Sequence, residues 1–230
     1  FRSNKRIFLY VVHEKILIID DYISSCLKNK PYVSKKYLEY FSPEFDPKST
    51  ETELFFQNRI NGENDAYICK MIRDDSIIEF IKYINKNNFS LLSRIPISPF
   101  ETNAILLKRE PSLIEYSAFY GSIQIFRFLV QNNVQLTKNI WDYAIHGRNA
   151  DIIHLIEENE IWPTKQCIKN SIRCHHNEIT EYFLNNYPNE FDEQDFYASI
   201  KFYNFQYFPK TFDNRELFYY LCKYDYYLFV

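Results

Sequence analysis

The sequence predicts an all-α protein, organised as a helical-repeat solenoid with an N-terminal helical region that caps the array. Three stretches align without a gap at a spacing of 27 residues, namely Ser112–Val130, Asn139–Glu157 and Gln166–Leu184. The aligned columns keep their chemistry from unit to unit, which indicates structural periodicity. Within a unit the apolar residues recur at i, i+3 and i+4, the pattern of one helix face.

Five aligned columns support this alignment. One is apolar (Ile114, Trp141, Ile168), one is small (Ser117, Ala144, Ser171), and one is isoleucine throughout (Ile125, Ile152, Ile179). Two bulky columns follow: Phe128, Leu155 and Tyr182, then Leu129, Ile156 and Phe183. Small residues let neighbouring helices approach closely and bulky residues fill the seam, so each unit is expected to be a packed pair of short helices.

Local signals place the ends of these helices. Gly121 suits the turn between the two helices of the first unit because glycine accepts backbone angles that other residues resist. The glycine of the second unit, Gly147, lies one column earlier. Thr137 and Thr164 precede the next first helices and suit N-caps, since a hydroxyl can accept from a free amide of the first turn.

A helix pair of this length cannot bury its apolar face alone, so stacked units must supply the core, and about three are needed. Residues 65–230 provide them as a degenerate copy at 65–111, repeats at 112–138, 139–165, 166–194 and 195–214, and a partial copy at 215–230. Pro209 is expected to interrupt the second helix of the 195–214 copy. The last copy has no polar cap and the sequence starts at Phe1, which together predict a segment of a longer protein.

Residues 1–64 show no 27-residue register and are treated as a separate helical region. Helices are expected at Lys5–Leu27, Ser34–Phe41 and Thr52–Ile60, joined by polar and proline-containing loops. These helices would cap the start of the repeat array.

The repeat units occupy the pattern of an ankyrin repeat. SLIEYSA lies where the ankyrin first helix has T-P-L-H-x-A, and GSIQIFRFLV resembles the second helix, G-x-x-x-I-V-x-x-L-L. The sequence resembles the ankyrin-like repeat proteins of a large uncharacterised family expanded in a parasitic protist, whose usual entry into the array is similar to DDSIIEFIKYI and FETNAILLKREPSLIEY. The T-P-L-H tetrad is absent, and 27 residues is shorter than the usual 33. The resemblance covers Ala66–Val230 and implies a protein-interaction scaffold rather than an enzyme.

Composition excludes several classes of function. The chain of 230 residues has three glycines, too few for a glycine-rich phosphate loop, and a net charge of −3 gives no electrostatic footprint for nucleic acid. The apolar run Ile7–Val12 is too short to span a membrane. Five widely spread cysteines argue against a disulfide framework, so a reducing, cytoplasmic location is expected. The oligomeric state is not indicated.

One group of residues could bind a metal: Cys167, Cys174, His175 and His176, with His146 from the preceding unit. Zinc prefers thiolate and imidazole ligands in a tetrahedron. The spacing C-x6-C-H-H matches none of the usual zinc motifs, and adjacent histidines should diverge. The interpretation adopted is structural: Cys167 fills space, His175 and His176 occupy the turn columns of Gly121 and Ser122, and no metal or cofactor is expected.

A cysteine nucleophile is the enzymatic alternative. His146 or His154 would act as base, oriented by Asp142 or Asp151. Known catalytic motifs such as G-x-S-x-G, H-E-x-x-H and the P-loop are absent, so the chain is not expected to be an enzyme.

Partner binding is assigned to a ladder of residues at i and i+4 on successive first helices: Glu115, Phe119, Asp142, His146, Lys169 and Arg173. These are expected to point away from the seam, and their charge changes from acidic to basic along the array. The resemblance implies that first helices and inter-unit loops form the concave binding face, which adds Trp162 to the ladder. Trp and Arg often carry interface energy. The alternative is that Trp162 is buried against the next unit and that Phe119 touches the helices before it.

The expected function is therefore a non-catalytic module that binds a protein partner, without nucleic acid or membrane. One alternative is a purely structural segment of a longer solenoid, and a second is a Cys/His metal site or enzyme. Charge reversal along the ladder would separate the first two, because only a binding module would lose its partner.

Overall fold

A computed structural model of the chain describes residues 5–28, 35–45, 52–188, 197–208 and 215–226. In these ranges the regular elements are sixteen α-helices and the 3-10 helix η3, which confirms the all-α fold class. The β-type pairing within them is a single antiparallel bridge between Arg94 and Ser112. Among the described residues, none of the helices combines the length and the apolar character needed to span a lipid bilayer.

The chain divides into two compact units. The first comprises residues 1–74 and 78–113, and the second comprises residues 75–77 and 114–230. The sequence-based boundary between residues 64 and 65 therefore falls inside the first unit.

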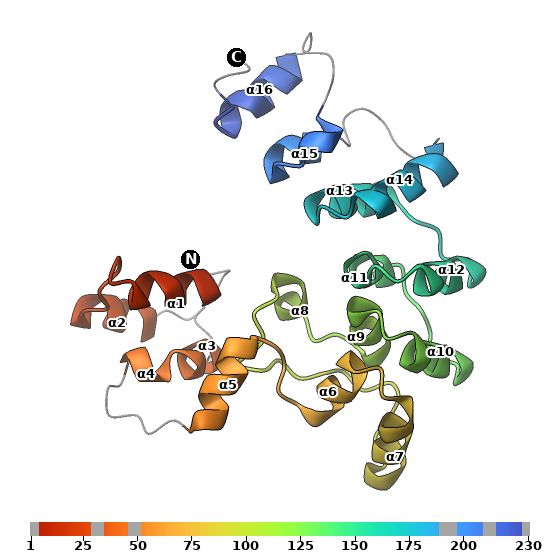
Figure 1. The fold of residues 1–230 in the computed structure, drawn as a ribbon, viewed down its shortest axis with the longest axis horizontal. Helices are drawn as coiled ribbons and strands as arrows, with labels where there is room; N and C mark the ends of the chain where they lie inside the picture. The colour runs from red at the N-terminus through yellow and green to blue at the C-terminus, as the bar shows by residue number, and fades with distance from the viewer. Residues whose placement is uncertain (1–4, 29–34, 46–51, 189–196, 209–214, 227–230) are drawn as a thin grey trace. The chain divides into compact units, whose positions relative to one another are not determined.

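The first unit contains eight short helices, the last six coloured from orange to yellow-green in Figure 1. Their bounds are α1 (Lys5–His13), α2 (Asp21–Lys28), α3 (Lys35–Tyr40), α4 (Ser42–Phe45), α5 (Glu53–Asn61), α6 (Tyr67–Arg73), α7 (Ile77–Asn87) and α8 (Ala104–Lys108). An aromatic cluster of Phe8, Tyr40, Phe41, Phe55 and Phe100 forms one core of this unit. Apolar burial on this scale stabilises a unit whose helices are too short to persist alone.

The prediction of one helix at Lys5–Leu27 is wrong, because the chain forms two helices, α1 and α2, with a break between them. Lys15 adopts a left-handed backbone conformation (φ 56°), which ends α1. The Asp20 carboxylate then accepts from the backbone N–H of Ile23 at 2.7 Å and starts α2. The first residue of the helix expected at Ser34–Phe41 lies outside the described residues. The observed helix in this range, α3, ends at Tyr40.

The other early expectations fit the structure closely. Thr52 is the N-cap of α5, where its hydroxyl accepts from the N–H of Phe55 at 3.2 Å, and Gly62 ends the helix at φ 68°. The degenerate copy expected at 65–111 contains α6, α7 and α8.

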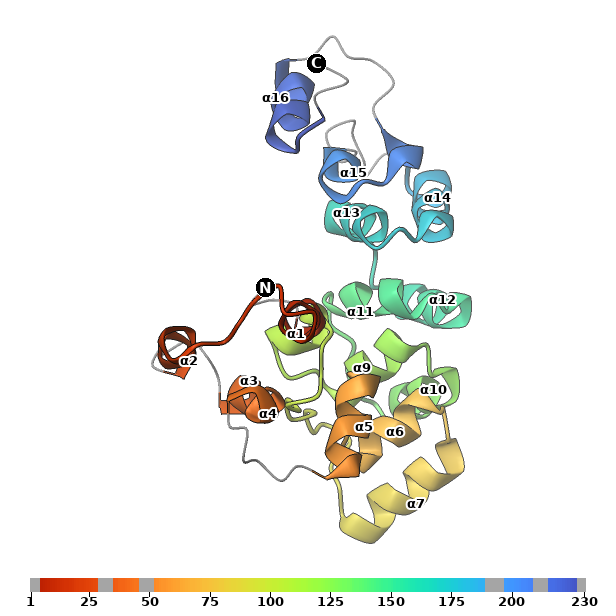
Figure 2. The same cartoon turned by 60° about the vertical axis from the view of Figure 1, so that its left-hand side comes forward.

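The second unit contains helix pairs that follow the predicted units. They are α9 (Leu113–Tyr120) with α10 (Ile123–Gln131), α11 (Ile140–Gly147) with α12 (Ala150–Glu158), α13 (Lys165–Arg173) with α14 (Asn177–Asn186), and α15 (Tyr197–Phe202) with η3 (Phe205–Tyr207), followed by α16 (Arg215–Lys223). The first helices pack in series, α11 against α13, α13 against α15 and α15 against α16, as Figure 2 shows. Pro209, which was expected to interrupt the second helix of the last pair, lies outside the described residues.

The turn inside each pair repeats with the sequence period. Its central residue has a positive φ at Gly121 (70°), Arg148 (52°), His175 (57°) and Tyr203 (59°). In three of these turns the following N–H bonds back five residues, from Ser122 to Ser117 O at 2.9 Å, from His176 to Ser171 O and from Asn204 to Ser199 O, which is the bond of a Schellman helix end. In the other turn the N–H of Arg148 bonds back four residues to Ala144 O at 3.1 Å. His175 and His176 therefore occupy the columns of Gly121 and Ser122, as expected.

The columns that repeat from unit to unit form the core of the second unit. Side chains of the apolar, small and isoleucine columns are buried, and so is the Leu129 column: Ile114, Trp141, Ile168, Ser117, Ala144, Ser171, Ile125, Ile152, Ile179, Leu129, Ile156 and Phe183. The Phe128 column is only half-buried. The periodic pattern of the sequence thus identifies the buried face of each helix pair.

The two expected threonine caps have different outcomes. Thr164 is the N-cap of α13, and its backbone N–H donates to the Cys167 sulfur at 3.3 Å. Thr137 is not a cap, because α11 begins at Ile140 and Asn139 occupies the N-cap position. The Thr137 carbonyl accepts from the N–H of Ile140 at 2.9 Å, so a turn precedes the helix.

Asp75 caps a helix that lies far along the chain. Its carboxylate accepts from the N–H groups of Gln124 and Ile125 at the start of α10, both at 3.0 Å. We expect Asp75→Ala to lower the free energy of unfolding by about 1–2 kcal/mol, because the cap is lost and alanine tolerates the φ of 46° poorly.

Chemical denaturation followed by circular dichroism would measure this change. Asp75→Asn keeps an acceptor and the tolerance of positive φ, so it should retain most of the stability. The neighbouring exposed Asp74→Ala is the matched control and should change stability by less than about 0.5 kcal/mol. Equal losses in the Asp74 and Asp75 variants would contradict the capping role.

Candidate functional site

The ladder residues lie on α9, α11 and α13, the first helices of three successive pairs. Five of them are half-buried, but Glu115 is only 7% exposed. The expectation that Glu115 points away from the seam is therefore not met, because its side chain is buried. The acidic end of the ladder is less accessible than the basic end.

Phe119 on α9 and His146 on α11 contact each other between two neighbouring helix pairs. Their rings stack with centroids 5.1 Å apart and an interplanar angle of 25°. Asp142 on α11 likewise contacts the next first helix, since its carboxylate accepts a hydrogen bond from the side-chain amide of Asn170 on α13 at 2.7 Å. These contacts run from each first helix to the next, so the middle of the ladder holds neighbouring pairs together.

The basic end of the ladder opens into a groove of about 410 Å³ on α13, α15 and α16. The groove is lined by four cationic side chains, four aromatic ones and three others: Lys169, Arg173, Lys201, Lys223, Tyr197, Phe202, Tyr220, Tyr224, Gln166, Asn170 and Ala198. None of these described lining residues is acidic. The groove therefore concentrates positive charge in a chain whose net charge is −3.

Cations and aromatic rings are interleaved in this groove. The Arg173 guanidinium lies 5.6 Å from the centroid of the Phe202 ring, and the Lys201 ammonium lies 5.2 Å from the same centroid. The Lys223 ammonium lies 5.8 Å from the Tyr224 ring centroid. Such contacts order long side chains over apolar surface while leaving their charge available to a ligand.

Lys201 and Lys223 occupy ladder positions that the sequence analysis did not identify. Both lie two residues before a left-handed turn residue, Tyr203 and Asp225, as Arg173 lies two before His175. The column thus continues as Phe119, His146, Arg173, Lys201 and Lys223. One extra residue before α15 and a shorter final unit broke the 27-residue spacing, and counting back from the turn would have recovered the column.

Trp162 lies in the loop between α12 and α13 and is 56% exposed. The alternative that it is buried is therefore wrong, whereas its role in binding stays a prediction. Its nearest aromatic neighbour is Tyr187, with ring centroids 6.3 Å apart. The Tyr187 hydroxyl donates to the Glu157 carboxylate at 2.7 Å, which holds the second ring beside Trp162.

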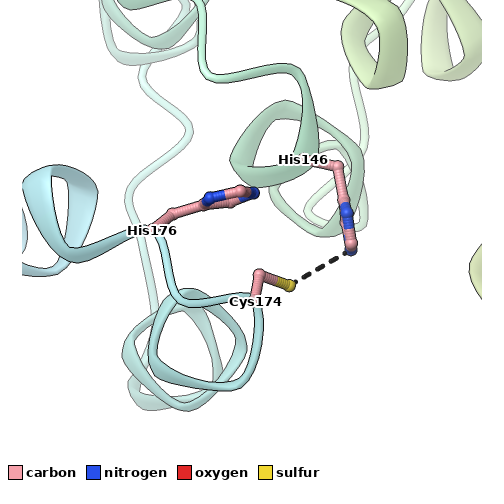
Figure 3. A group of neighbouring side chains, drawn as sticks. All are labelled: His146, Cys174 and His176. Atoms are coloured by element: carbon pink, nitrogen blue, oxygen red, sulfur yellow. Dashed lines mark hydrogen bonds between the residues drawn. The ribbon is translucent and has the colours of Figure 1, made fainter. Parts of the chain in front are cut away.

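Three of the candidate metal ligands come together: His146 from α11, and Cys174 and His176 from the turn between α13 and α14. One donor atom from each lies within 4.8 Å of the others. The His146 Nε2 and Cys174 Sγ atoms are 3.3 Å apart, and Figure 3 shows the two side chains facing each other with His176 beside them.

The other two candidates are directed elsewhere. The Cys167 side chain is buried, and its sulfur accepts a hydrogen bond from the backbone N–H of Thr164 at the start of α13. The His175 ring lies with Nε2 2.8 Å from the carbonyl oxygen of Phe202. The adjacent histidines diverge as predicted, but the divergence leaves His176 on the side of Cys174 and His146.

Burial determines the charge states in this cluster. It raises the pKa of the Cys174 thiol to about 11, and it lowers the pKa of His146 to about 4, with further lowering by the nearby His176 and Arg173. Cys174 is therefore a thiol at neutral pH and a poor nucleophile, since the thiolate is the reactive form. His154, the other suggested base, is exposed and lies 3.4 Å from the Glu157 carboxylate.

Comparison with known proteins gives one match. Residues 131–211 match the model of a domain of unknown function, DUF3447. This match covers less than half of the chain and includes α11 to α15 and η3. No curated protein and no solved structure matches the sequence significantly.

Proposed function

We propose that this chain is a non-catalytic interaction module, an ankyrin-like solenoid that binds an acidic segment of a protein partner. The observation that carries the proposal is the groove on α13, α15 and α16, which has four cations and four aromatic rings among its described lining residues. Two of these cations, Lys169 and Arg173, belong to the ladder predicted from the sequence. The ankyrin-like interpretation rests on the 27-residue period and on the helix pairs that follow it.

Charge complementarity favours an acidic partner. The lining supplies positive charge from three successive first helices, so an extended acidic segment could contact several cations at once. Complementary charge across an interface raises association rates and orients the partner, and the tyrosine rings add apolar contact area. The interaction should weaken as salt is added, because exposed charges are screened over about 8 Å at physiological ionic strength.

The stacking of pairs supports a rigid binding face. Trp141, Phe183 and the small-residue column are buried between the helices, so the exposed side of the first helices is held by a packed core. A face of this kind can present side chains at regular intervals without changing shape on binding. The protonated Cys174 thiol supports the non-catalytic part of the proposal.

The test uses a display library of acidic and neutral peptides, followed by affinity measurement on the enriched sequences by fluorescence anisotropy. Wild type is compared with Arg173→Glu/Lys201→Glu. Lys82→Glu/Lys86→Glu on the exposed side of α7 is the control with the same change in net charge. We expect acidic peptides to be enriched, and the groove variant to bind them at least about tenfold more weakly, which corresponds to about 1.4 kcal/mol. The control should bind as wild type does.

Two outcomes would contradict this function. If no peptide is enriched, or if both double variants bind alike, the structural-segment alternative is favoured. A single-stranded oligonucleotide that binds more tightly than any peptide, and is lost with Arg173→Glu/Lys201→Glu, would replace the protein partner with nucleic acid, because stacked aromatics and cations also suit single strands.

A further inference from the structure

The cluster of His146, Cys174 and His176 offers a donor set that suits a soft or borderline metal. One thiol and two imidazoles are brought together from two neighbouring helix pairs. Zinc binds sulfur and imidazole nitrogen in tetrahedral sites, and sites with three protein ligands leave a fourth position open to water or another ligand. The short Cys-x-His segment supplies two of the donors, and a residue 28 positions earlier than Cys174 supplies the third.

The distances in the cluster are close to those of a zinc site. With Zn–N near 2.0–2.1 Å and Zn–S near 2.3 Å, tetrahedral donors lie about 3.3–3.6 Å apart. The His146 Nε2 and Cys174 Sγ atoms are already 3.3 Å apart. All three donor atoms lie within 4.8 Å of one another, so the His176 ring would need to approach by about 1.5 Å at most.

The backbone positions each donor from a defined element. Cys174 is the C-cap of α13, and its N–H donates to the carbonyl of Asn170 at 2.9 Å. His176 is the N-cap residue of α14, and its N–H donates to the carbonyl of Ser171 at 3.0 Å. The left-handed residue between them turns Cys174 and His176 to the same side while its own ring faces Phe202. Preorganised donors of this kind lose little conformational entropy on binding.

The third donor is held by stacking. The Phe119 ring lies against the His146 imidazole at 5.1 Å, which restricts rotation of that ring. His146 lies in the last turn of α11, so its side chain reaches across to the end of α13. Figure 3 shows the three side chains entering the same space from α11 and from the turn that follows α13.

The two nearby arginines each have a contact outside the cluster. The Arg173 guanidinium lies over the Phe202 ring, and Arg148 pairs with the Glu178 carboxylate. A metal must displace the proton of the Cys174 thiol, which is the usual course of zinc binding to cysteine.

We propose that His146, Cys174 and His176 form a zinc site that links the α11–α12 pair to the α13–α14 pair, with the fourth coordination position open. This site is separate from the basic groove and does not depend on its partner. It revises the expectation of no metal ligands, which rested on the spacing of adjacent histidines. A bound ion would connect consecutive helix pairs and raise the melting temperature by a few degrees, since a ligand of the folded state stabilises it.

The test measures zinc affinity on the whole chain, reduced and freed of metal, by competition with a chromophoric chelator. Two variants remove ligands, Cys174→Ser and His176→Asn. The second should fold, because Asn149 and Asn204 occupy the same column in the neighbouring pairs. Cys222→Ser/His154→Asn is the matched control, since both side chains are exposed and outside the cluster.

We expect one zinc ion per chain at micromolar affinity or tighter, at least tenfold weaker binding in each ligand variant, and unchanged binding in the control. Cobalt(II) should give a sulfur-to-metal charge-transfer band that Cys174→Ser removes. The proposal is overturned if wild type does not bind micromolar zinc, if the ligand variants bind as wild type does, or if bound cobalt shows no thiolate band. Circular dichroism checks that each variant is folded.

Discussion

Replacing Trp141 with alanine is expected to lower the free energy of unfolding by about 4 kcal/mol. Trp141 is 1% exposed and fills the apolar column at the centre of the second unit. Its ring meets Phe183 edge to face with centroids 5.5 Å apart, and its indole N–H donates to the carbonyl of Ile161 at 3.1 Å. The substitution creates a large cavity and removes the partner of a carbonyl, and both effects destabilise.

Thermal unfolding followed by circular dichroism would measure this loss as a fall in melting temperature of roughly 8–16 °C. Trp162→Ala is the matched control, because the same side chain is removed from a position that is 56% exposed. That variant should lose less than about 1 kcal/mol. Similar melting temperatures for the two variants would show that Trp141 is not part of a packed core.

Gly147→Ala is the second substitution with a large expected effect. In an ordinary helix this change stabilises by about 1 kcal/mol, because alanine is the better helix former. At this position an added Cβ would lie 2.0 Å from the carbonyl oxygen of Ala118 and 2.9 Å from the N–H nitrogen of Gly121. Both contacts are with the backbone of the neighbouring pair, which cannot move as a side chain can. We expect a loss of about 3 kcal/mol, the cost of overpacking.

The sign of the change is the informative result, and the melting temperature gives it directly. Gly62→Ala is a control in which the three atoms nearest to an added Cβ all belong to the flexible side chain of Arg6. Its φ of 68° still makes alanine unfavourable, so a smaller loss of about 1–2 kcal/mol is expected there. A Gly147→Ala variant that is as stable as wild type would mean that α9 and α11 do not approach closely.

The helical class and the helix pairs were predictable because the apolar columns repeat at a fixed spacing. Ile125, Leu129 and their equivalents follow the helical period, and the structure buries them. The period is a property of the sequence that survives changes of residue type. It identifies elements well and their first residues less well, as the start of α11 at Ile140 rather than after Thr137 shows.

The N-terminal region was predicted less well because it lacks a repeat to compare with. The break after α1 depends on the left-handed Lys15 and on the capping bond of Asp20, neither of which is marked by glycine or proline. An apolar run with a few charges at its end is compatible with one helix or two. Only the packing of the surrounding aromatic residues selects between them.

The candidate surface was recovered in part. Lys169 and Arg173, which the sequence analysis placed on the ladder, line the basic groove. Lys201 and Lys223 also line it, but they were not assigned to the ladder because the last units depart from the 27-residue spacing. Glu115 was misplaced because position on a helix was inferred from i and i+4 alone. Its burial depends on what lies over α9, which the repeat does not encode.

The histidine and cysteine cluster illustrates a different limit. Linear spacing argued against it, since C-x6-C-H-H matches none of the usual spacings of zinc ligand pairs. Stacking of pairs brings His146 to Cys174 and His176 across one repeat, so the relevant spacing is the repeat length. Sequence motifs drawn from compact zinc domains do not include that geometry.

The turn inside each helix pair has a consequence for how such a chain can evolve. Its shape is set by backbone hydrogen bonds, and Arg148, His175 and Tyr203 adopt the same left-handed conformation as Gly121. Left-handed conformations disfavour non-glycine residues by about 1–2 kcal/mol, so many residue types are tolerated there once the surrounding core is stable. What is inherited from unit to unit is then the distance between turns rather than the identity of the residues at them. Descendant copies can lose recognisable similarity while each turn still delivers its side chain to the same place.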